Sequence, residues 1–340
     1  MVKVGIIGLG HIAAKYGSPD SLNPYCHAGG IRFSDQVELT AVADLSEAAL
    51  SAFREEWGAV FPDVHYYQST SAMLEQESLD IVAICVRGPY HYQVAKDVLA
   101  AKPKAIFLEK PPTCSLEEMD ELVALAAELR IPITASYSRH WAPHILKLQQ
   151  LVQDGLIGDV QKVVGYTGGD VLSFASHTTD LICQFAGYEP ATVFATGKAG
   201  RPAPAGYEDE PALDAMVISF ANGVTGIQVG AAGMHGDFYC EVFGTKGKVR
   251  AGMYVAPYAC DSEGNEVDLS EYDSRDTTSV FTVAYNQIAG YLNGGAAPHC
   301  SDDAFICIHE IGFGAIESIR TGAPIGLPNT NRTRKIFANG

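Results

Sequence analysis

The sequence predicts an α/β protein of two domains: an N-terminal Rossmann domain with a doubly wound parallel sheet, and a C-terminal α+β domain with a large, mostly antiparallel open sheet. Three observations lead to this prediction. The chain of 340 residues is longer than a single core usually serves. Its first half alternates apolar strands with helices, and its second half places several strand signals in succession. We expect the domains to be 1–139 and 140–340.

The chain opens on a strand and a glycine turn. Residues 2–7 are nearly all apolar, as expected for a central parallel strand covered on both faces. The pattern G-x-G-x-x-A at 8–13 follows, and such a turn brings backbone N–H groups close to a pyrophosphate at a helix N-terminus. A glycine turn without a ligand is the alternative, but the position between a strand and a predicted helix favours a dinucleotide. The turn supplies four candidate cofactor contacts: Gly8, Gly10, His11 and Ile12.

Strands and helices continue to alternate up to residue 139. The strand signals lie at 37–43, 64–67, 79–86, 105–108 and 131–137. The helix signals lie at 46–57, 71–76, 90–101 and 115–129, the last of which opens on a capping box. Before the second strand comes an irregular stretch, 15–34, which is longer than a usual connection and is typical of functional or mobile loops.

The second strand ends at Asp44. A carboxylate at this position can accept hydrogen bonds from both ribose hydroxyls of NAD and would repel the 2′-phosphate of NADP. Leu45 supplies no compensating positive charge, so we expect NAD rather than NADP. Asp44 lies 34 positions after Gly10, against a usual spacing of about 20, and an insertion at 15–34 would account for the difference. The alternative is that Asp44 neighbours the N-cap of the next helix.

Polar residues also follow two later strands. Ligands of open α/β sheets bind outside the carboxyl ends of the strands, where Arg87, His91, Glu109 and Lys110 are found. We expect all four to contribute to the cofactor site. The ammonium group of Lys110 is also a candidate catalytic group, because it can bond a substrate hydroxyl and stabilise a developing alkoxide. A solvated surface lysine is the alternative.

The second half differs in its pattern. A helix signal at 144–154 is followed by strand signals at 160–166, 191–197, 213–220, 224–230, 238–243 and 248–251. Asn222-Gly223 between two alternating runs predicts a hairpin. Because the strands follow one another directly, we expect an antiparallel sheet. Two helices, 277–293 and 302–321, are expected to close the chain.

A further helix is predicted to begin near residue 176, and it carries His177 and Asp180. Residues three apart share a helix face, and a carboxylate beside an imidazole sets its tautomer and raises its basicity. His177 is therefore a candidate proton acceptor. A helix start with polar residues in its first turn is the alternative. We further propose three residues for substrate contact, although simple packing would explain each equally well: Arg139, Trp141 and Asp170.

Composition excludes several classes of protein. The net charge of −17 argues against a nucleic-acid surface. No apolar run reaches the roughly 18 residues of a membrane span, and because the N-terminus enters a strand directly we expect no signal peptide. The eight cysteines form no C-x-x-C pair, so we expect reduced thiols in a cytoplasmic protein, without a zinc or other metal site.

Several motifs together resemble the Gfo/Idh/MocA family of NAD(P)-dependent sugar and inositol oxidoreductases. They are G-L-G-H-I-A at 8–13, A-V-A-D at 41–44, G-P-Y-H at 88–91, E-K-P-P at 109–112, Q-D-G-L-I-G-D-V at 153–160, S-H-T-T-D at 176–180 and E-S-I-R-T-G-A-P-I at 317–325. The resemblance covers nearly the whole chain. It implies a sugar or polyol substrate and a homodimer or homotetramer built on the open sheet.

The resemblance also implies roles for single residues. Lys110 would contact the reacting hydroxyl, and the Lys110–Pro111 peptide would be cis. His177 would be the general acid/base, and Asp180 would touch the substrate or support the histidine. Many family members carry an aspartate four residues before the histidine, where this chain has Ser173, with Asp170 three residues earlier still.

The missing aspartate has three possible interpretations: a different substrate, a proton relay through Asp170, or a different reaction. Some relatives use bound NAD for a transient oxidation within an elimination or a glycoside hydrolysis. An NAD-recycling lyase or glycosidase is therefore the alternative to a dehydrogenase, and a non-catalytic dinucleotide-binding sensor is a third reading.

Overall fold

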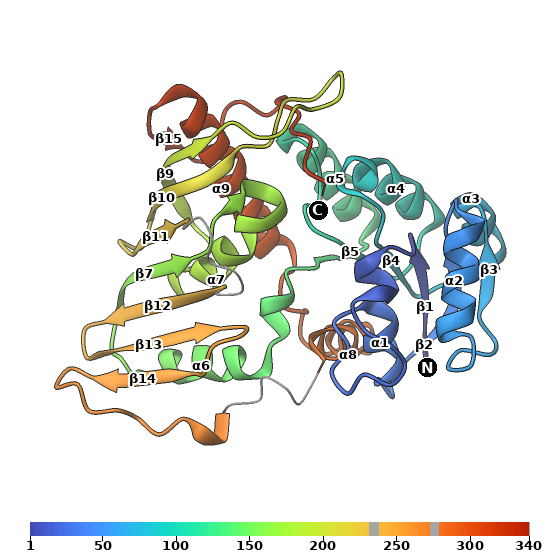
Figure 1. The fold of residues 1–340 in the computed structure, drawn as a ribbon, viewed down its shortest axis with the longest axis horizontal. Coiled ribbons are helices and arrows are strands. Elements are labelled where there is room, and N and C mark those ends of the chain that lie inside the picture. Colours follow the sequence, from blue (N-terminus) through green and yellow to red (C-terminus); the bar gives the residue numbers. More distant parts are fainter. Residues whose placement is uncertain (231–237, 273–278, 340) are drawn as a thin grey trace. The chain divides into compact units, whose positions relative to one another are not determined.

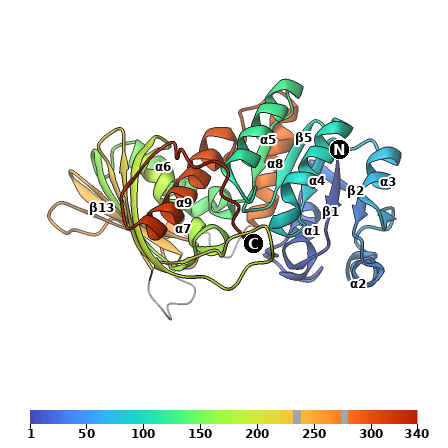
Figure 2. The same cartoon turned by 90° about the horizontal axis from the view of Figure 1, so that it is seen from above.

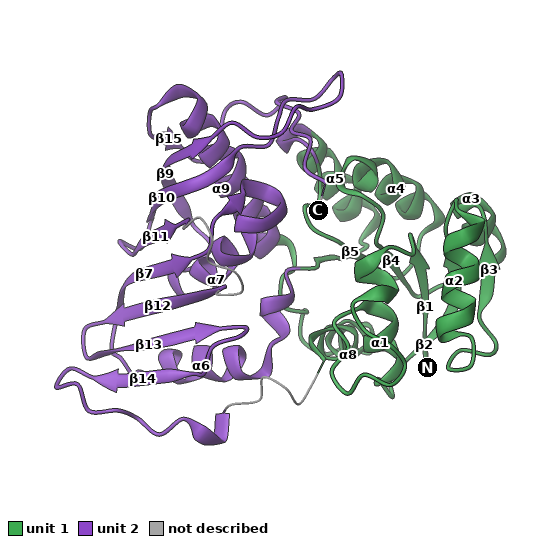
Figure 3. Ribbon diagram, in the orientation of Figure 1, with its two compact units in different colours: residues 1–113, 118–136, 276–302 green, residues 114–117, 137–275, 303–340 purple. Residues whose placement is uncertain are grey.

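The structure is a computed structural model, and it describes residues 1–230, 238–272 and 279–339. The chain folds into two compact units, which Figure 3 shows in different colours. The first unit consists of residues 1–113, 118–136 and 276–302, and the second of 114–117, 137–275 and 303–340. The chain thus passes from one unit to the other near the proposed division at 139/140, and helix α8 (Val280–Leu292) then returns to the first unit.

The first unit is built on a six-stranded, all-parallel sheet with the order β3-β2-β1-β4-β5-β6 (Figure 1). The strands are β1 (Val2–Ile7), β2 (Val37–Ala43), β3 (His65–Tyr67), β4 (Ile81–Ile84), β5 (Ala105–Leu108) and β6 (Ile133–Ala135). This confirms the predicted Rossmann sheet. The central strands β4 and β5 are buried at every residue, as expected where helices cover a sheet on both faces.

Helices connect these strands close to the predicted positions. They are α2 (Glu47–Trp57), α3 (Thr70–Gln76), α4 (Gly88–Ala101) and α5 (Leu116–Leu129). Ser46 is the N-cap of α2, and its side chain accepts a hydrogen bond from the N–H of Ala49 at 3.3 Å. The last helix of this unit, α8, was predicted to begin at residue 277. It begins at Val280, and residues 277–278 lie outside the described part of the chain.

The region after the glycine turn differs from the prediction in two ways. The helix expected there is a single π-type turn, His11–Lys15, and the stretch 15–34 contains a short helix, α1 (His27–Arg32). A six-residue helix with two glycines produces no periodicity that a sequence window detects. Tertiary contacts with α8, which lies beside α1 in Figure 1, hold it instead. Thr282 of α8 donates to the carbonyl of Gly30 at 2.9 Å, and a Cβ at Gly30 would lie 2.3 Å from Phe281.

The second unit contains a nine-stranded sheet, ordered β14-β13-β12-β7-β11-β10-β9-β15, with β8 paired to β10. Its strands are β7 (Val160–Tyr166), β8 (Gly169–Asp170), β9 (Pro190–Lys198), β10 (Ala212–Phe220), β11 (Thr225–Val229), β12 (Tyr239–Gly244), β13 (Gly247–Gly252), β14 (Tyr258–Asp261) and β15 (Ile325–Gly326). Among the strand pairs of the described residues, β7–β11 alone is parallel, so the mostly antiparallel sheet is confirmed. The predicted hairpin at 222–223 joins β10 to β11.

Three helices of this unit, α6 (Pro143–Gln153), α7 (Ser176–Ala186) and α9 (Asp302–Thr321), lie on one face of the sheet (Figure 2). Every residue of α7 is buried. Two glycines allow this helix to approach the strands closely: a Cβ at Gly165 of β7 would lie 2.5 Å from Thr178, and one at Gly226 of β11 would lie 2.7 Å from Ile182. The sheet therefore fixes the position of the helix that carries His177.

Candidate active site

The glycine turn of the first unit leaves space for a ligand. Gly8 has φ +89°, and a Cβ there would lie 2.8 Å from the backbone of Cys85 and Val86, so only glycine fits beside the end of β4. A Cβ at Gly10, in contrast, would meet no atom within 4 Å. Gly8 thus allows the turn to pack closely against the end of β4. Gly10 leaves its backbone accessible, as binding of a pyrophosphate by backbone N–H groups requires. The residues of this turn fit a dinucleotide.

Asp44 ties the turn to the second strand. One carboxylate oxygen, Oδ2, accepts from the N–H of Leu9 at 2.7 Å, and Oδ1 accepts from the N–H of Ser46 at 2.8 Å. The second contact supports the alternative in which Asp44 helps to start α2. Each oxygen retains a further lone pair, so a contact with ribose is compatible with both bonds. Leu45 is 81% exposed and offers no cation for a 2′-phosphate.

His91 and Arg87 lie at the start of α4. Arg87 is the exposed N-cap residue. The His91 ring is buried, with Nδ1 2.7 Å from the carbonyl oxygen of Pro111 and Nε2 2.8 Å from that of Val86. Burial lowers the pKa of His91, so the ring is neutral and donates to one of these carbonyls. His91 therefore has a structural role between β4 and the E-K-P-P segment, and its contact with a cofactor stays a prediction.

Glu109 belongs to a buried polar chain that the sequence did not indicate. Its Oε1 lies 3.0 Å from Nε2 of His27, whose Nδ1 lies 2.7 Å from the hydroxyl of Tyr285. Burial raises the pKa of Glu109, but the hydrogen bond and charge of His27, with smaller effects from Ser136 and Lys110, outweigh it and leave the pKa lowered. The Glu109 side chain thus points into the interior of the first unit. These bonds do not show whether Glu109 also contacts the cofactor, and that contact stays a prediction.

Lys110 follows directly and is half-buried. The Lys110–Pro111 peptide is cis, as the resemblance implied. Strand β5, which ends two residues before Lys110, is hydrogen-bonded to β4, and β4 to β1. Because these strands are parallel, the lysine and the glycine turn stand at the same edge of one sheet.

In the second unit, His177 lies in the first turn of α7, 9% exposed. Its ring meets the edges of two aromatic rings, with centroid distances of 6.4 Å to Tyr137 and 5.7 Å to Phe238. The guanidinium of Arg139 stacks over the same Phe238 ring at 4.5 Å. The structure thus brings together two predicted residues, His177 and Arg139, through a phenylalanine that the sequence pattern did not single out.

Asp180 has partners that the spacing did not predict. One carboxylate oxygen, Oδ1, forms an ion pair with Nε2 of His140, and Oδ2 accepts from the side-chain amide of Gln184 at 3.0 Å. Three residues advance a helix by about 300°, so the side chains of His177 and Asp180 point about 60° apart around the helix axis. Asp180 is fully buried, and Trp141 is 1% exposed. Their predicted contacts with substrate stay predictions, and both side chains belong to the core of this unit.

Ser173 and Asp170 lie just before α7. The hydroxyl of Ser173 donates to Glu210 at 2.6 Å, a carboxylate that the sequence analysis missed because it lies 37 residues away. Asp170 is exposed as a whole residue, but neighbouring atoms keep some water from its carboxyl group and thereby raise its pKa, while the charge of Arg201 lowers it in part. Glu210, in contrast, is 6% exposed, and burial raises its pKa to about 7.

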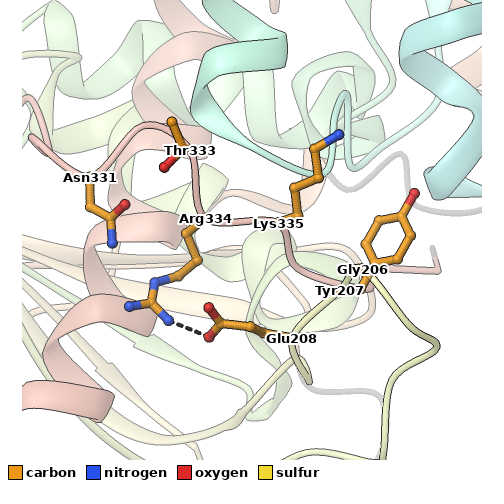
Figure 4. Close-up of a pocket in the computed structure, with 7 residues that line it drawn as sticks. All are labelled: Gly206, Tyr207, Glu208, Asn331, Thr333, Arg334 and Lys335. Carbon is orange, nitrogen blue, oxygen red and sulfur yellow. Dashed lines mark hydrogen bonds and ion pairs between the residues drawn. The ribbon is translucent and has the colours of Figure 1, made fainter.

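Two hollows lie elsewhere on the described surface. One, of about 390 Å³, adjoins the glycine turn and is lined in part by Leu9, Lys15 and Trp57. The other, of about 480 Å³, is in the second unit, and Figure 4 shows the ion pair of Arg334 with Glu208 on its wall. Neither includes Lys110 or His177. Among the described residues no group of three or more His, Cys, Asp or Glu side chains is placed to hold a metal ion, and no helix is long and apolar enough to cross a membrane.

A Rossmann unit with an open glycine turn, joined in one chain to a second unit built on a mixed sheet, is compatible with the class of NAD-binding oxidoreductases. Residues 2–137 match the model of the oxidoreductase family with an NAD-binding Rossmann fold, and residues 164–250 match the C-terminal domain of the same family. The chain belongs to the Gfo/Idh/MocA family. Its cofactor is NAD, and both the expected family and the expected fold are confirmed.

Individual proteins are similar over most of the chain. A myo-inositol 2-dehydrogenase of Thermotoga maritima is 24% identical over 266 residues, which cover 74% of this chain and 75% of that protein. The structure of an aldose-aldose oxidoreductase from Caulobacter crescentus in complex with glycerol has a TM-score of 0.78 at 17% identity, covering 96% and 99% of the two chains. An oxidoreductase from Agrobacterium radiobacter, solved with NAD⁺, L-tartaric acid and magnesium, has a TM-score of 0.74 at 18% identity, covering 96% and 98%. At these identities the two structures show the fold alone.

Proposed function

We propose that this protein is an NAD-dependent dehydrogenase that oxidises a secondary alcohol of an inositol, a sugar or a sugar derivative. The observation that carries the proposal is the position of Lys110 at the same sheet edge as the open glycine turn. An ammonium group at this edge can donate a hydrogen bond to the hydroxyl of an alcohol bound next to a dinucleotide, and it can stabilise the negative charge that develops on that oxygen. The similarity to a myo-inositol 2-dehydrogenase supports the choice of a cyclic polyol as substrate.

Cofactor binding is assigned to the turn and its neighbours. The backbone at Gly8, Gly10, His11 and Ile12 holds the pyrophosphate, and Asp44 accepts from the ribose hydroxyls. Arg87, His91 and Glu109 are assigned to the same edge of the sheet, His91 and Glu109 through the backbone segments that they anchor. When bound, NAD supplies the acceptor for the hydride that leaves the carbinol carbon.

The two catalytic roles fall to Lys110 and His177. The Lys110 ammonium donates a hydrogen bond to the alcohol oxygen and stabilises the negative charge that grows on it. His177 accepts the hydroxyl proton, which leaves a ketone or a lactone as product. Substrate contacts are proposed for Arg139, Trp141, Asp170 and Asp180; of these, Asp170 is exposed and offers its carboxylate directly. The assembly that we propose is a homodimer or a homotetramer in the cytoplasm.

The experiment is formation of NADH, followed at 340 nm, with a panel of inositols and aldoses. We expect turnover of at least one polyol and a loss of about 10²- to 10⁴-fold in His177→Ala. Lys110→Ala should lose activity as well, whereas Lys104→Ala, which removes an exposed lysine paired with Asp80 at 2.9 Å, should match the wild type. If no polyol reacts, the proposal is wrong.

Two other outcomes have definite meanings. Conversion of a substrate without net NADH, by protein that retains its NAD through purification, would identify a lyase or glycosidase that recycles the cofactor. Binding of NAD with no reaction that depends on His177 would instead identify a dinucleotide-binding sensor.

A further inference from the structure

Two exposed aromatic side chains of the second unit pack against the same buried phenylalanine. Phe174 is 46% exposed and Tyr254 is 52% exposed, and the ring of each meets the ring of Phe238, which is 7% exposed. We propose that these three rings form an aromatic platform that binds the unbroken C–H face of a cyclic polyol and so selects substrates by the arrangement of their hydroxyls. This inference rests on the proposed function, because it takes the substrate to be a polyol whose hydroxyl reaches His177.

Phe238 is the centre of the platform. The centroid of its ring lies 4.9 Å from that of Phe174, with an interplanar angle of 57°, and 6.3 Å from that of Tyr254, with an angle of 65°. The backbone of Phe238 has φ +24°, a conformation that a bulky residue rarely adopts. Two hydrogen bonds hold it: the N–H donates to Oγ1 of Thr167 at 3.1 Å, and the carbonyl accepts from the N–H of Met253 at 3.3 Å. A strained backbone that its surroundings fix in this way is typical of ligand sites.

The chain also holds the exposed Phe174 ring in position. Phe174 lies in the π-type turn Val171–Ala175, which runs directly into α7. Beside the ring lies Gly169, where φ is +102° and a Cβ would lie 2.9 Å from Cδ1 of Phe174. The absence of a side chain at Gly169 therefore lets the ring lie close to the backbone. A single exposed apolar side chain needs no explanation, but one that is packed between a glycine and a buried ring is a preformed contact surface.

The platform adjoins polar groups of the candidate active site. The His177 ring meets Phe238 edge-on at 5.7 Å, and the guanidinium of Arg139 lies over the same phenylalanine ring at 4.5 Å. A cyclic polyol has two kinds of surface, hydroxyl groups and C–H groups, and the C–H groups gather on the faces of its ring. The aromatic rings suit the C–H groups, while the imidazole and the guanidinium suit the hydroxyls. Apolar walls with a few polar groups are the usual composition of a small-molecule site.

This combination predicts which inositols bind well. In scyllo-inositol every hydroxyl is equatorial, so both faces present only C–H groups. In myo-inositol the single axial hydroxyl interrupts one face, and the other face, with the hydrogens of carbons 1, 3 and 5, stays unbroken. In D-chiro-inositol two axial hydroxyls lie on opposite faces, so both faces are interrupted. A hydroxyl pressed against a phenyl ring loses its hydrogen bonds to water, so we expect scyllo- and myo-inositol to bind better than D-chiro-inositol.

The first test is saturation-transfer NMR of myo-inositol with the NADH-loaded protein. Irradiation of the aromatic protons of the protein should transfer more saturation to the hydrogens of carbons 1, 3 and 5 than to those of carbons 2, 4 and 6. The difference should shrink in Phe174→Ala and in Tyr254→Ala. This measurement needs no turnover, so it tests the platform even if no polyol is oxidised.

The second test measures affinity and kinetics in variants of the exposed rings. Phe174→Ala should raise the KM for myo-inositol about tenfold and leave kcat within about threefold, because the platform binds the ground state and the transition state alike. It should also reduce the preference for scyllo- over D-chiro-inositol. Phe174→Tyr keeps a ring and should stay close to the wild type. Phe33→Ala in the first unit removes a phenylalanine of the same exposure, 45%, and is the matched control.

The outcomes separate this inference from the proposed function. Equal saturation of both faces of myo-inositol, no binding of scyllo- or myo-inositol, or wild-type affinity in both Phe174→Ala and Tyr254→Ala would overturn the platform. Oxidation of another polyol that depends on His177 would then leave the proposed function intact. A clear preference for one face without any oxidation would support the platform and contradict the proposed function.

Discussion

Glu109 in the first unit and Glu210 in the second are buried to nearly the same extent, with 5% and 6% of their surfaces exposed, yet their pKa values move in opposite directions. Glu109 faces His27, which can carry a positive charge, and Lys110 adds a second cation. Among the described residues, Glu210 accepts hydrogen bonds from two backbone amides and a hydroxyl, and Asp170 is a like charge nearby. At Glu210 the hydrogen bonds from neutral donors lower the pKa by less than burial raises it, whereas at Glu109 the hydrogen bond and charge of His27 outweigh the effect of burial. The first glutamate is therefore a fixed anchor, and the second exchanges a proton near neutral pH.

The largest effect that this comparison predicts is on stability. Glu109→Ala should lower the free energy of unfolding by about 3–5 kcal/mol, because it leaves the fully buried His27 without its ionic partner. Glu210→Ala should cost less, about 1–3 kcal/mol, since it leaves only neutral donors unsatisfied. Urea denaturation at pH 7 measures both, and the exposed Glu55→Ala is the control, expected within about 0.5 kcal/mol of the wild type. A larger loss of unfolding free energy in Glu210→Ala than in Glu109→Ala would contradict this account.

The pH dependence of stability is the next test. The folded protein keeps the proton of Glu210 up to about pH 7, while the unfolded chain releases it near the ordinary value of 4.5. Ionisation thus favours the unfolded chain between these values, and the wild type loses stability as the pH rises. Glu210→Gln lacks this loss, so its free energy of unfolding relative to the wild type should rise by up to about 3 kcal/mol between pH 4.5 and 8.

Glu109 should behave with the opposite sign. Its pKa is lowered, so the stability that it contributes is present above the ordinary value of 4.5 and is lost as the pH falls below it. Relative to Glu109→Gln, the wild type should therefore lose stability on acidification. Thermal unfolding of both variants across the pH range measures the two slopes, and equal signs would contradict the account.

A third carboxylate, Asp44, extends the comparison to cofactor choice. Asp44→Ala should narrow the preference for NAD over NADP by about tenfold, since it removes both a ribose acceptor and the charge that repels a 2′-phosphate. Asp44→Asn keeps an acceptor for the N–H of Leu9 and tests the charge alone. Titrations of intrinsic fluorescence with NAD and NADP measure the affinities. Equal affinities in the wild type would refute the assignment.

The smallest predicted effect is that of Tyr285, the last residue of the hydrogen-bonded series Glu109, His27 and Tyr285. Tyr285→Phe removes the hydroxyl 2.7 Å from Nδ1 of His27 and should lower the free energy of unfolding by about 1 kcal/mol. Tyr291→Phe on the same helix, where the side chain is 37% exposed, is the control. An equal change in both variants would show that His27 does not depend on this bond.

The features that the sequence predicted are local ones. The glycine turn, Asp44 at the end of β2, the E-K-P-P segment after β5 and the helix of His177 each follow from a few consecutive residues and their periodicity. The partners that tune these groups are distant: Tyr285 lies 258 residues from His27, and Glu210 lies 37 residues from Ser173. Strand pairing and helix packing bring them together, and no spacing rule encodes that. The sequence pattern missed strands β8, β14 and β15, because segments of two to four residues carry too little alternation to be detected.

The central claim is that the chain moves a hydride from a carbinol carbon and forms NADH as a net product. The most direct test uses myo-inositol carrying deuterium on its ring carbons, or the polyol that the panel identifies, with mass analysis of the cofactor. The account predicts singly deuterated NADH in an amount equal to the ketone formed. Product that accumulates without net reduced cofactor, or reduced cofactor without deuterium, would contradict it.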